Sequence, residues 1–170
     1  MKSTLPNICK LILDRNDLNR KRRATLQKKY RLIEKLQSNR KLLHSEKYEQ
    51  RYEKIQQDVE YYRQQLKTAL IPIKGMCRDL NLALVWDANW HIIALEDVVL
   101  RHQRNKLISD CRKIHTAWWG NRHIDTTSEL DQQYCDFSRE ITVISEKLNS
   151  TNLSEKDMRE IVIESILLKE

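Results

Sequence analysis

The sequence predicts an all-α protein, an elongated helical bundle or coiled-coil hairpin of five to six helices. Only 2 Gly and 2 Pro occur among the 170 residues, so the turn residues that a strand-and-turn architecture needs are nearly missing. Apolar side chains recur at alternating spacings of four and three over residues 48–73 and 130–148, the pattern of helices that pack along one another. Hydrophobic residues make up 40% of the chain, which is enough for a packed core.

The front of the chain is strongly basic, and a first helix is predicted there, from about residue 8 or 17 to residue 43. Residues 1–47 hold 14 Lys or Arg against 4 Asp or Glu, a balance of +10, whereas the other 17 bases and 20 acids balance to −3. The apolar stripe of this helix is weak, so we expect it to project and to be partly solvated. We divide the chain into a basic helical segment, residues 1–45, and a helical bundle, residues 46–170.

The clearest heptads belong to a helix predicted over residues 46–71. Its seam is expected to contact a helical protein partner or a second copy of the chain, through Tyr48, Tyr52, Ile55, Val59, Tyr62 and Leu66. Pro72 is expected to end the helix, because an interior proline lacks the N–H group and crowds the preceding turn. Residues 9–70 form either one rod or two antiparallel helices, and the turn-forming residues near position 40 favour the hairpin.

Two further segments are predicted before residue 120. A short helix over about residues 76–85 leads to Asp87, which is expected to be the N-cap of a helix over residues 88–118. The first half of that helix is apolar nearly all round, so we place it at the centre of the core. Its polar seam residues Asp97 and Arg104 should meet counter-charges or lie at an edge.

The last part of the chain shows two helix starts. Thr126 opens a capping box before a helix over residues 127–148, which is the expected partner of the helix over residues 46–71. Ser154, with Asp157 three positions later, predicts a second box and a final helix that reaches residue 168.

Residue content excludes several classes of enzyme. With glycines only at Gly75 and Gly120, neither a P-loop nor a G-x-G-x-x-G turn can be formed. No His follows a Glu by three positions, so the ligand pairs of carboxylate-bridged di-iron bundles are missing, and so is H-E-x-x-H. Two pairs one helical turn or so apart are expected to be surface contacts, not acid–base catalysts: Asp97 with His102 and Asp110 with His115. We predict that the protein is not an enzyme.

One group of residues has the chemistry of a zinc site. Cys111 and His115 lie one helical turn apart, and His123 and Cys135 could complete four ligands. The spacing matches no established zinc finger, and Cys111 occupies an apolar seam, so packing is the favoured interpretation. We predict no metal and no cofactor.

Cysteine usage and hydropathy indicate an intracellular protein, cytoplasmic or nuclear. The 4 cysteines are spread out, without a C-x-x-C pair, and the first residues contain no long apolar run. The longest apolar stretches are short or interrupted by acidic residues, so no membrane association is expected.

The basic cluster carries the most functional information. We predict that it holds the phosphate backbone of a nucleic acid through Arg20, Lys21, Arg22, Arg23, Lys28, Lys29 and Arg31. The run from Asn19 to Arg23 would also suit a nuclear import signal, and the plain alternative is a solvated helix face. A basic segment before heptads is the layout of basic-zipper DNA binders, but the seam lacks their leucines, so no family is assigned.

The leading hypothesis is therefore a non-enzymatic helical binding protein that associates with nucleic acid through its basic first helix and with a protein through its heptads. The alternative is a coiled-coil structural subunit or adaptor of a larger protein assembly, whose basic end meets an acidic protein surface. The residues leave open whether the partner is DNA, RNA or an acidic protein.

Overall fold

The computed structural model describes residues 5–39, 42, 45–120 and 127–168, which form five helices and a small antiparallel sheet. The chain order is α1 (Leu5–Ser38), α2 (Glu46–Asp79), β1 (Leu82–Trp86), β2 (Ile92–Asp97), α3 (Val98–Gly120), α4 (Thr127–Thr151), β3 (Leu153–Ser154) and α5 (Glu155–Leu167). The prediction of a helical protein with five to six helices and hairpin architecture is confirmed. The sheet is an addition that the sequence did not predict.

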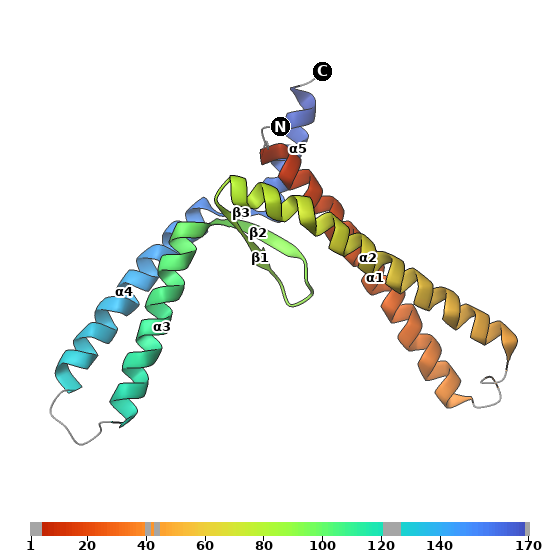
Figure 1. Cartoon of the computed structure of the whole chain (residues 1–170), viewed down its shortest axis with the longest axis horizontal. Helices are drawn as coiled ribbons and strands as arrows, with labels where there is room; N and C mark the ends of the chain where they lie inside the picture. Colours follow the sequence, from red (N-terminus) through yellow and green to blue (C-terminus); the bar gives the residue numbers. More distant parts are fainter. Residues whose placement is uncertain (1–4, 40–41, 43–44, 121–126, 169–170) are drawn as a thin grey trace.

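Two long helix hairpins diverge from a common hub (Figure 1). In one hairpin α1 lies along α2, and in the other α3 lies along α4. Residues 9–70 therefore form the predicted hairpin, and the boundary proposed at residue 45 falls at its turn.

The predicted pairing between the helix over residues 46–71 and the helix over residues 127–148 is wrong. Each packs instead against the helix that precedes it in the chain. Heptad spacing shows that a helix has a packing face, but it does not identify which helix packs against that face. Few residues separate the two helices of each hairpin, so the adjacent helix is favoured as the antiparallel neighbour.

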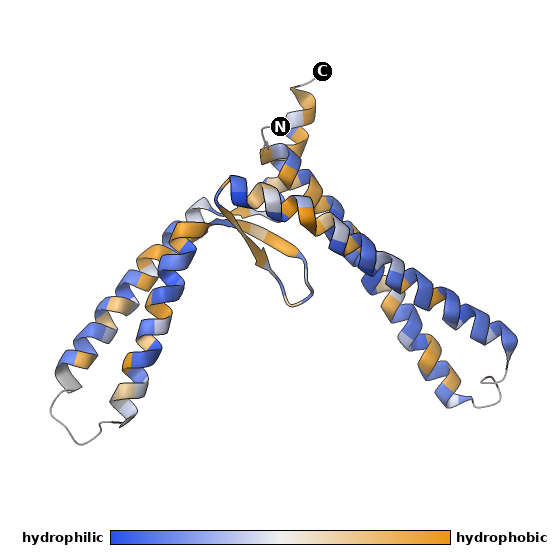
Figure 2. Ribbon diagram, viewed as in Figure 1, coloured by the Kyte–Doolittle hydropathy of each residue, from blue (hydrophilic) through white to orange (hydrophobic). Residues whose placement is uncertain are grey.

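The core lies in the hub, where the first half of α1 is buried. Hydrophobic side chains from four elements meet there: Ile8, Cys9, Ile12, Ile73, Cys77, Ile92, Leu95 and Met158. Figure 2 shows apolar residues concentrated at the hub, with mostly hydrophilic residues along the far half of α1 and α2. The expectation that the first helix projects as a separate element is therefore wrong for its first half. Packing against α5 and the sheet covers that half.

The helix predicted to end at Pro72 continues to Asp79. Pro72 is exposed, while Ile73 and Cys77 are buried in the core on the same final turns. An interior proline costs about 3 kcal/mol, and burying two apolar side chains contributes a comparable amount, about 1.5–3 kcal/mol for a large one. Tertiary packing thus offsets the local preference of the proline.

The predicted short helix at residues 76–85 and the predicted start of a helix at Ala88 are also wrong, because a β-hairpin occupies this region. β1 pairs with β2 from Leu82 opposite Asp97 to Trp86 opposite Ile92. Asn81, at φ 54°, ends α2 immediately before β1. Apolar runs of five or six residues fit a buried helix and a buried strand equally well, so periodicity could not separate the two.

Asp97 and Arg104, the two polar seam residues, both find partners. The Asp97 carboxylate accepts a hydrogen bond from the Leu100 backbone N–H at 2.9 Å, so Asp97 caps α3. Arg104 lies 3.7 Å from the buried Glu96 carboxylate. The expected counter-charge for Arg104 is therefore confirmed, and Asp97 stands at the helix end.

The last two helices agree with the sequence. α4 and α5 begin where predicted, although Thr126 lies outside the described residues. The capping box of α5 is formed: the Ser154 N–H donates to the Asp157 carboxylate at 2.8 Å, and the Asp157 N–H donates to Ser154 Oγ at 3.3 Å. Leu153 and Ser154 pair with β2 as the third strand. Within the described residues, no helix has the length and apolar character that crossing a membrane requires.

Candidate nucleic-acid interface

A groove lies where α1, α2 and the turn between β1 and β2 meet, and it holds about 520 Å³. Four of its lining residues carry a positive charge and none carries a negative charge. The lining consists of Arg15, Asn19, Arg22, Arg63, Leu66, Lys67, Leu70 and Trp90. We call it the basic groove. Because cations converge on a concave surface, the groove attracts anions.

Helical spacing brings the lining residues of each helix onto one face. On α1, Arg15, Asn19 and Arg22 are separated by four and three positions, and on α2 Arg63 and Lys67 are four positions apart. Arg63 lies 3.6 Å from the Glu60 carboxylate, but both side chains are at least half exposed. Such a pair is weak, so Arg63 is available to a ligand.

Arg15 and Asn19 form the inner wall of the groove. Only 6% of Arg15 and 1% of Asn19 is exposed. Arg15 Nη1 donates to the Trp90 carbonyl at 3.0 Å, and its guanidinium lies 4.6 Å from the centre of the Trp86 ring. Burial lowers the pKa of Arg15, but an arginine remains charged at neutral pH. The groove therefore has a fixed positive charge in its wall.

Three polar atoms of the wall have no hydrogen-bond partner within the protein. They are Nε of Arg15, Oδ1 of Asn19 and Nε of Arg22, and each is buried. Buried polar atoms in folded proteins are nearly always paired. Their concentration at one place distinguishes the basic groove from ordinary surface.

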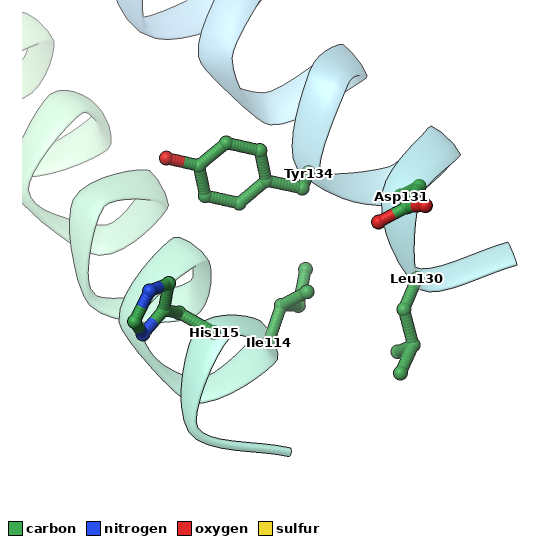
Figure 3. Close-up of a pocket in the computed structure, with 5 residues that line it drawn as sticks. All are labelled: Ile114, His115, Leu130, Asp131 and Tyr134. Carbon is green, nitrogen blue, oxygen red and sulfur yellow. The ribbon is translucent and has the colours of Figure 1, made fainter. Parts of the chain in front are cut away.

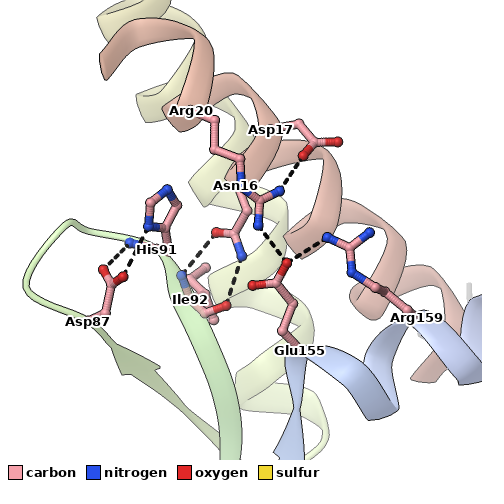
Figure 4. Close-up of polar contacts among 8 residues, drawn as sticks. All are labelled: Asn16, Asp17, Arg20, Asp87, His91, Ile92, Glu155 and Arg159. Carbon is pink, nitrogen blue, oxygen red and sulfur yellow. Dashed lines mark hydrogen bonds and ion pairs between the residues drawn. The ribbon is translucent and has the colours of Figure 1, made fainter. Parts of the chain in front are cut away.

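The turn that carries Trp90 is held by α1 and by its own first residue. Asn19 Nδ2 donates to the Asn89 carbonyl at 2.8 Å. The Asp87 carboxylate accepts a hydrogen bond from the Asn89 N–H at 2.8 Å. It also accepts from the His91 N–H at 2.8 Å, and its second oxygen lies 3.1 Å from His91 Nδ1 (Figure 4). The hydrogen bond from the His91 N–H is the largest effect on the pKa of Asp87, which lies below its ordinary value. Asp87 does cap backbone N–H groups, but those of a turn and not of the predicted helix.

Asn16 joins α1 to the start of β2. Its side-chain amide donates to the Ile92 carbonyl at 2.8 Å and accepts from the Ile92 N–H at 2.9 Å, both in a buried setting (Figure 4). These are the hydrogen bonds that a neighbouring strand would supply. The turn is therefore fixed to α1 at three successive points, by Arg15, Asn16 and Asn19.

Of the seven cations predicted to bind phosphate, only Arg22 lines the basic groove. Arg20 instead binds Asp17 and Glu155, the latter at 2.6 Å (Figure 4). The hydrogen bond that Arg20 donates to the Glu155 carboxylate raises the pKa of Arg20. Arg20 thus joins α1 to α5. Lys21 and Arg23 do not line the basic groove, nor a smaller groove around Lys28 and Arg31.

Three more of the predicted cations lie farther along the hairpin. Lys28 and Arg31 line a second, smaller groove of about 260 Å³ with Leu32, Lys35 and Arg51. Lys29 Nζ donates to Gln56 Oε1 at 2.6 Å and lies 5.3 Å from the centre of the Tyr52 ring. From Arg22 to Lys28 a helix turns by about 600°, or 240° beyond a full turn. The two grooves therefore face different sides of the hairpin.

Sequence reasoning assigned no site role to six residues of the basic groove: Arg15, Asn19, Arg63, Lys67, Leu70 and Trp90. Charge counting drew attention to the densest run, whereas the groove draws cations from two helices more than forty residues apart. The four-residue spacing of Arg63 and Lys67 was visible. Only the pairing of α1 with α2 shows that it matters.

The heptad residues predicted to contact a partner face α1. Ile55 and Leu66 are buried, and Tyr48, Tyr52, Val59 and Tyr62 are half-buried. Lys29 and Lys35 of α1 lie over the rings of Tyr52 and Tyr48, at 5.3 and 5.7 Å. This arrangement leaves the seam little surface for a second protein.

The far ends of α3 and α4 enclose another cavity, of about 230 Å³, lined by Ile114, His115, Leu130, Asp131 and Tyr134 (Figure 3). Tyr134 reaches from α4 toward α3. The residues that line the cavity are both apolar and polar. Of the suggested zinc ligands, His123 lies outside the described residues. Among the described residues, no three His, Cys, Asp or Glu side chains come together as a metal site would require.

No protein-family model, curated protein or solved structure matches this chain.

Proposed function

We propose that this protein is a non-enzymatic nucleic-acid-binding protein that holds phosphate groups in the basic groove. One observation carries the proposal: Arg15, Arg22, Arg63 and Lys67 converge from two helices on a groove whose lining contains no carboxylate. Phosphate groups are the anions that such spaced cations fit best. Lys28 and Arg31 in the second groove add positive charge on another side of the same hairpin.

The number of cations sets the expected salt dependence. Each neutralised phosphate lowers the logarithm of the association constant by about 0.7 per tenfold rise in salt for single strands and about 0.9 for duplex. Engagement of all four cations predicts a slope of about −3 to −3.5. Affinity should then fall by about 50- to 150-fold between about 50 and 200 mM salt.

The test is a fluorescence-anisotropy titration of labelled oligonucleotides with the wild type and the Arg63→Gln/Lys67→Gln variant. Both side chains are exposed on α2, so the fold should tolerate the change. We expect the variant to lose at least about tenfold in affinity at about 50 mM salt and to reduce the slope by about 1.5 to 2. Replacing Arg20 would be a poorer test, because its contact with Glu155 also joins α1 to α5.

The matched control is Arg139→Gln/Lys147→Gln, which removes the same two charges from exposed positions on α4. A general effect of net charge would weaken binding equally in both variants and would contradict a localised site. Absence of binding by the wild type at low salt would contradict the proposal altogether.

A second candidate is a structural subunit or adaptor of a protein assembly, and the end of α5 favours it. Four large apolar residues are exposed there: Ile163, Ile166, Leu167 and Leu168, the last at 87%. Figure 2 shows hydrophobic residues along α5, which leads away from the hub. Contiguous exposed apolar surface is typical of a protein contact.

Light scattering across a range of concentrations tests this candidate. A second copy docked through α5 would give a dimer that dissociates in the Ile163→Ser/Ile166→Ser variant. A monomeric wild type that binds oligonucleotides would exclude self-assembly and leave the first proposal in place.

A further inference from the structure

We propose that Trp90 makes the basic groove selective for unpaired nucleic acid, because its ring stacks on an exposed base while neighbouring cations hold the adjoining phosphates. The inference rests on the proposed function and adds the class of nucleic acid.

Trp90 has a backbone conformation that a large residue rarely adopts. Its φ is 64°, in the left-handed region that normally favours Gly, Asn or Asp. Strain of this kind persists only where the surroundings enforce it, and it is concentrated at functional sites. Here Arg15 holds the Trp90 carbonyl, Asn19 holds the Asn89 carbonyl, and the Trp90 N–H donates to the Asp87 carbonyl at 3.1 Å.

This enforced conformation does not bury the side chain. Trp90 is 67% exposed, although tryptophan is ordinarily among the more buried residues. Its ring meets Trp86 in an edge-to-face contact, with centroids 6.3 Å apart and an angle of 64° between planes. Trp86 in turn lies against the Arg15 guanidinium at 4.6 Å. The contact steadies the Trp90 ring and leaves most of its surface open.

The same groove places cations beside the ring. Arg22, Arg63 and Lys67 line it together with Trp90. An aromatic ring beside a cationic groove is the combination by which proteins bind single strands, since every base has a stacking face and every nucleotide a phosphate. Leu66 and Leu70 add an apolar wall that suits the edge of a base or sugar.

The size of the groove argues against duplex. A volume of about 520 Å³ falls within the range of about 300–1,000 Å³ for small-ligand sites. It admits a short length of flexible strand and cannot enclose a double helix. In a duplex the bases are already stacked on one another, so the Trp90 ring would have no base face to contact. A duplex would interact only with the cationic side chains.

A free nucleotide offers the same base and phosphate chemistry as a single strand. The dependence of affinity on chain length distinguishes these two ligands. A strand can engage the basic groove and also contact other cations of the hairpin, whereas a mononucleotide can engage only one groove. Binding should therefore strengthen with oligonucleotide length.

The experiment is an anisotropy titration with a labelled oligo(dT) of about 12 nucleotides and a duplex of equal length. Two variants remove the ring and suit the left-handed backbone, Trp90→Asn and Trp90→Gly, and a third, Trp90→Tyr, keeps an aromatic face. We expect Trp90→Asn and Trp90→Gly to lose about tenfold or more in single-strand affinity. Duplex affinity should change by less than about twofold, and Trp90→Tyr should retain most of the single-strand affinity.

Thermal unfolding of each variant separates this role from a structural one. Asn and Gly relieve the strained backbone, so we expect a melting temperature equal to or above that of the wild type together with weaker binding. A structural tryptophan would instead lower the melting temperature in both variants, and that result would overturn the inference.

The failure of this inference is distinguishable from failure of the proposed function. If Trp90→Asn binds oligo(dT) as well as the wild type while Arg63→Gln/Lys67→Gln binds it weakly, the stacking role is overturned and phosphate binding stands. Equal losses for single strand and duplex in Trp90→Asn would also overturn it. Binding of thymidine monophosphate as tight as that of the oligonucleotide, measured by competition, would overturn the assignment to a strand.

Discussion

Replacing Asn16 with Ala should destabilise the hub more than any other single polar substitution on α1. Asn16 is fully buried, and its amide pairs with both the N–H and the carbonyl of Ile92. Ile92 is itself fully buried, so water cannot replace the missing partner. The substitution therefore leaves two buried backbone groups without hydrogen bonds.

The expected loss in the free energy of unfolding follows from these two unpaired backbone groups. An unpaired buried donor or acceptor costs about 1–3 kcal/mol, so two groups with partial relaxation predict a loss of about 3 kcal/mol in the free energy of unfolding. For a chain of this length, each kcal/mol lowers the melting temperature by about 2–4 °C. We expect a fall of about 6–12 °C in the Asn16→Ala variant.

Urea unfolding monitored by circular dichroism provides the assay, with Asn7→Ala as the control. Asn7 is an exposed residue of the same helix, so its replacement should change stability by no more than about 0.5 kcal/mol. A loss below about 1 kcal/mol in Asn16→Ala, or a loss equal to that of the control, would show that the contact between α1 and β2 does not organise the hub.

Three further predictions concern the hub and α5. Burial raises the pKa of Cys9 and of Cys77 to about 11 each, so a brief iodoacetamide pulse at about pH 8 should label Cys111 and Cys135 first; mass spectrometry showing early labelling of the buried pair would refute a closed hub. Burial raises the pKa of Glu155, but hydrogen bonds from Arg159 and Arg20 and their charges outweigh it, so the pKa lies below its ordinary value. The contact thus stabilises the fold above the unfolded-state pKa and is lost as the pH falls through the lower folded-state pKa. Glu155→Gln should cost about 0.5–1 kcal/mol at neutral pH, with the difference from wild type vanishing in acid, and a pH-independent difference in urea titrations would contradict this. Ser154→Ala removes the cap of α5 and should cost about 1 kcal/mol, whereas Ser109→Ala, an exposed control on α3, should leave the urea midpoint unchanged.

The helical architecture could be predicted because its signals are local. The four-three spacing of apolar residues in α2 and α4, the scarcity of glycine and proline, and the Ser154 capping box each act within a few turns of chain. These features determine that a segment is helical and which face it buries. The helical state and the buried face are the same whichever neighbouring element covers that face.

The errors arose where long-range contacts outweighed local preference. Pro72 lies inside α2 because Ile73 and Cys77 are buried in the hub. Residues 82–86 and 92–97 form a hairpin, and its second strand also pairs with Leu153 and Ser154, more than fifty positions away. Asn16 then supplies hydrogen bonds to Ile92 across another long interval. No window of local sequence contains such partners.

The sequence by itself determined a helical protein with a cationic first half and a capped last helix. Tertiary structure alone decided that Arg22 joins Arg63 and Lys67 beside Trp90. It also decided that Arg20 is neutralised by Glu155. The physical reason is that helical periodicity acts between residues a few positions apart, whereas a groove is made by side chains that only packing brings together.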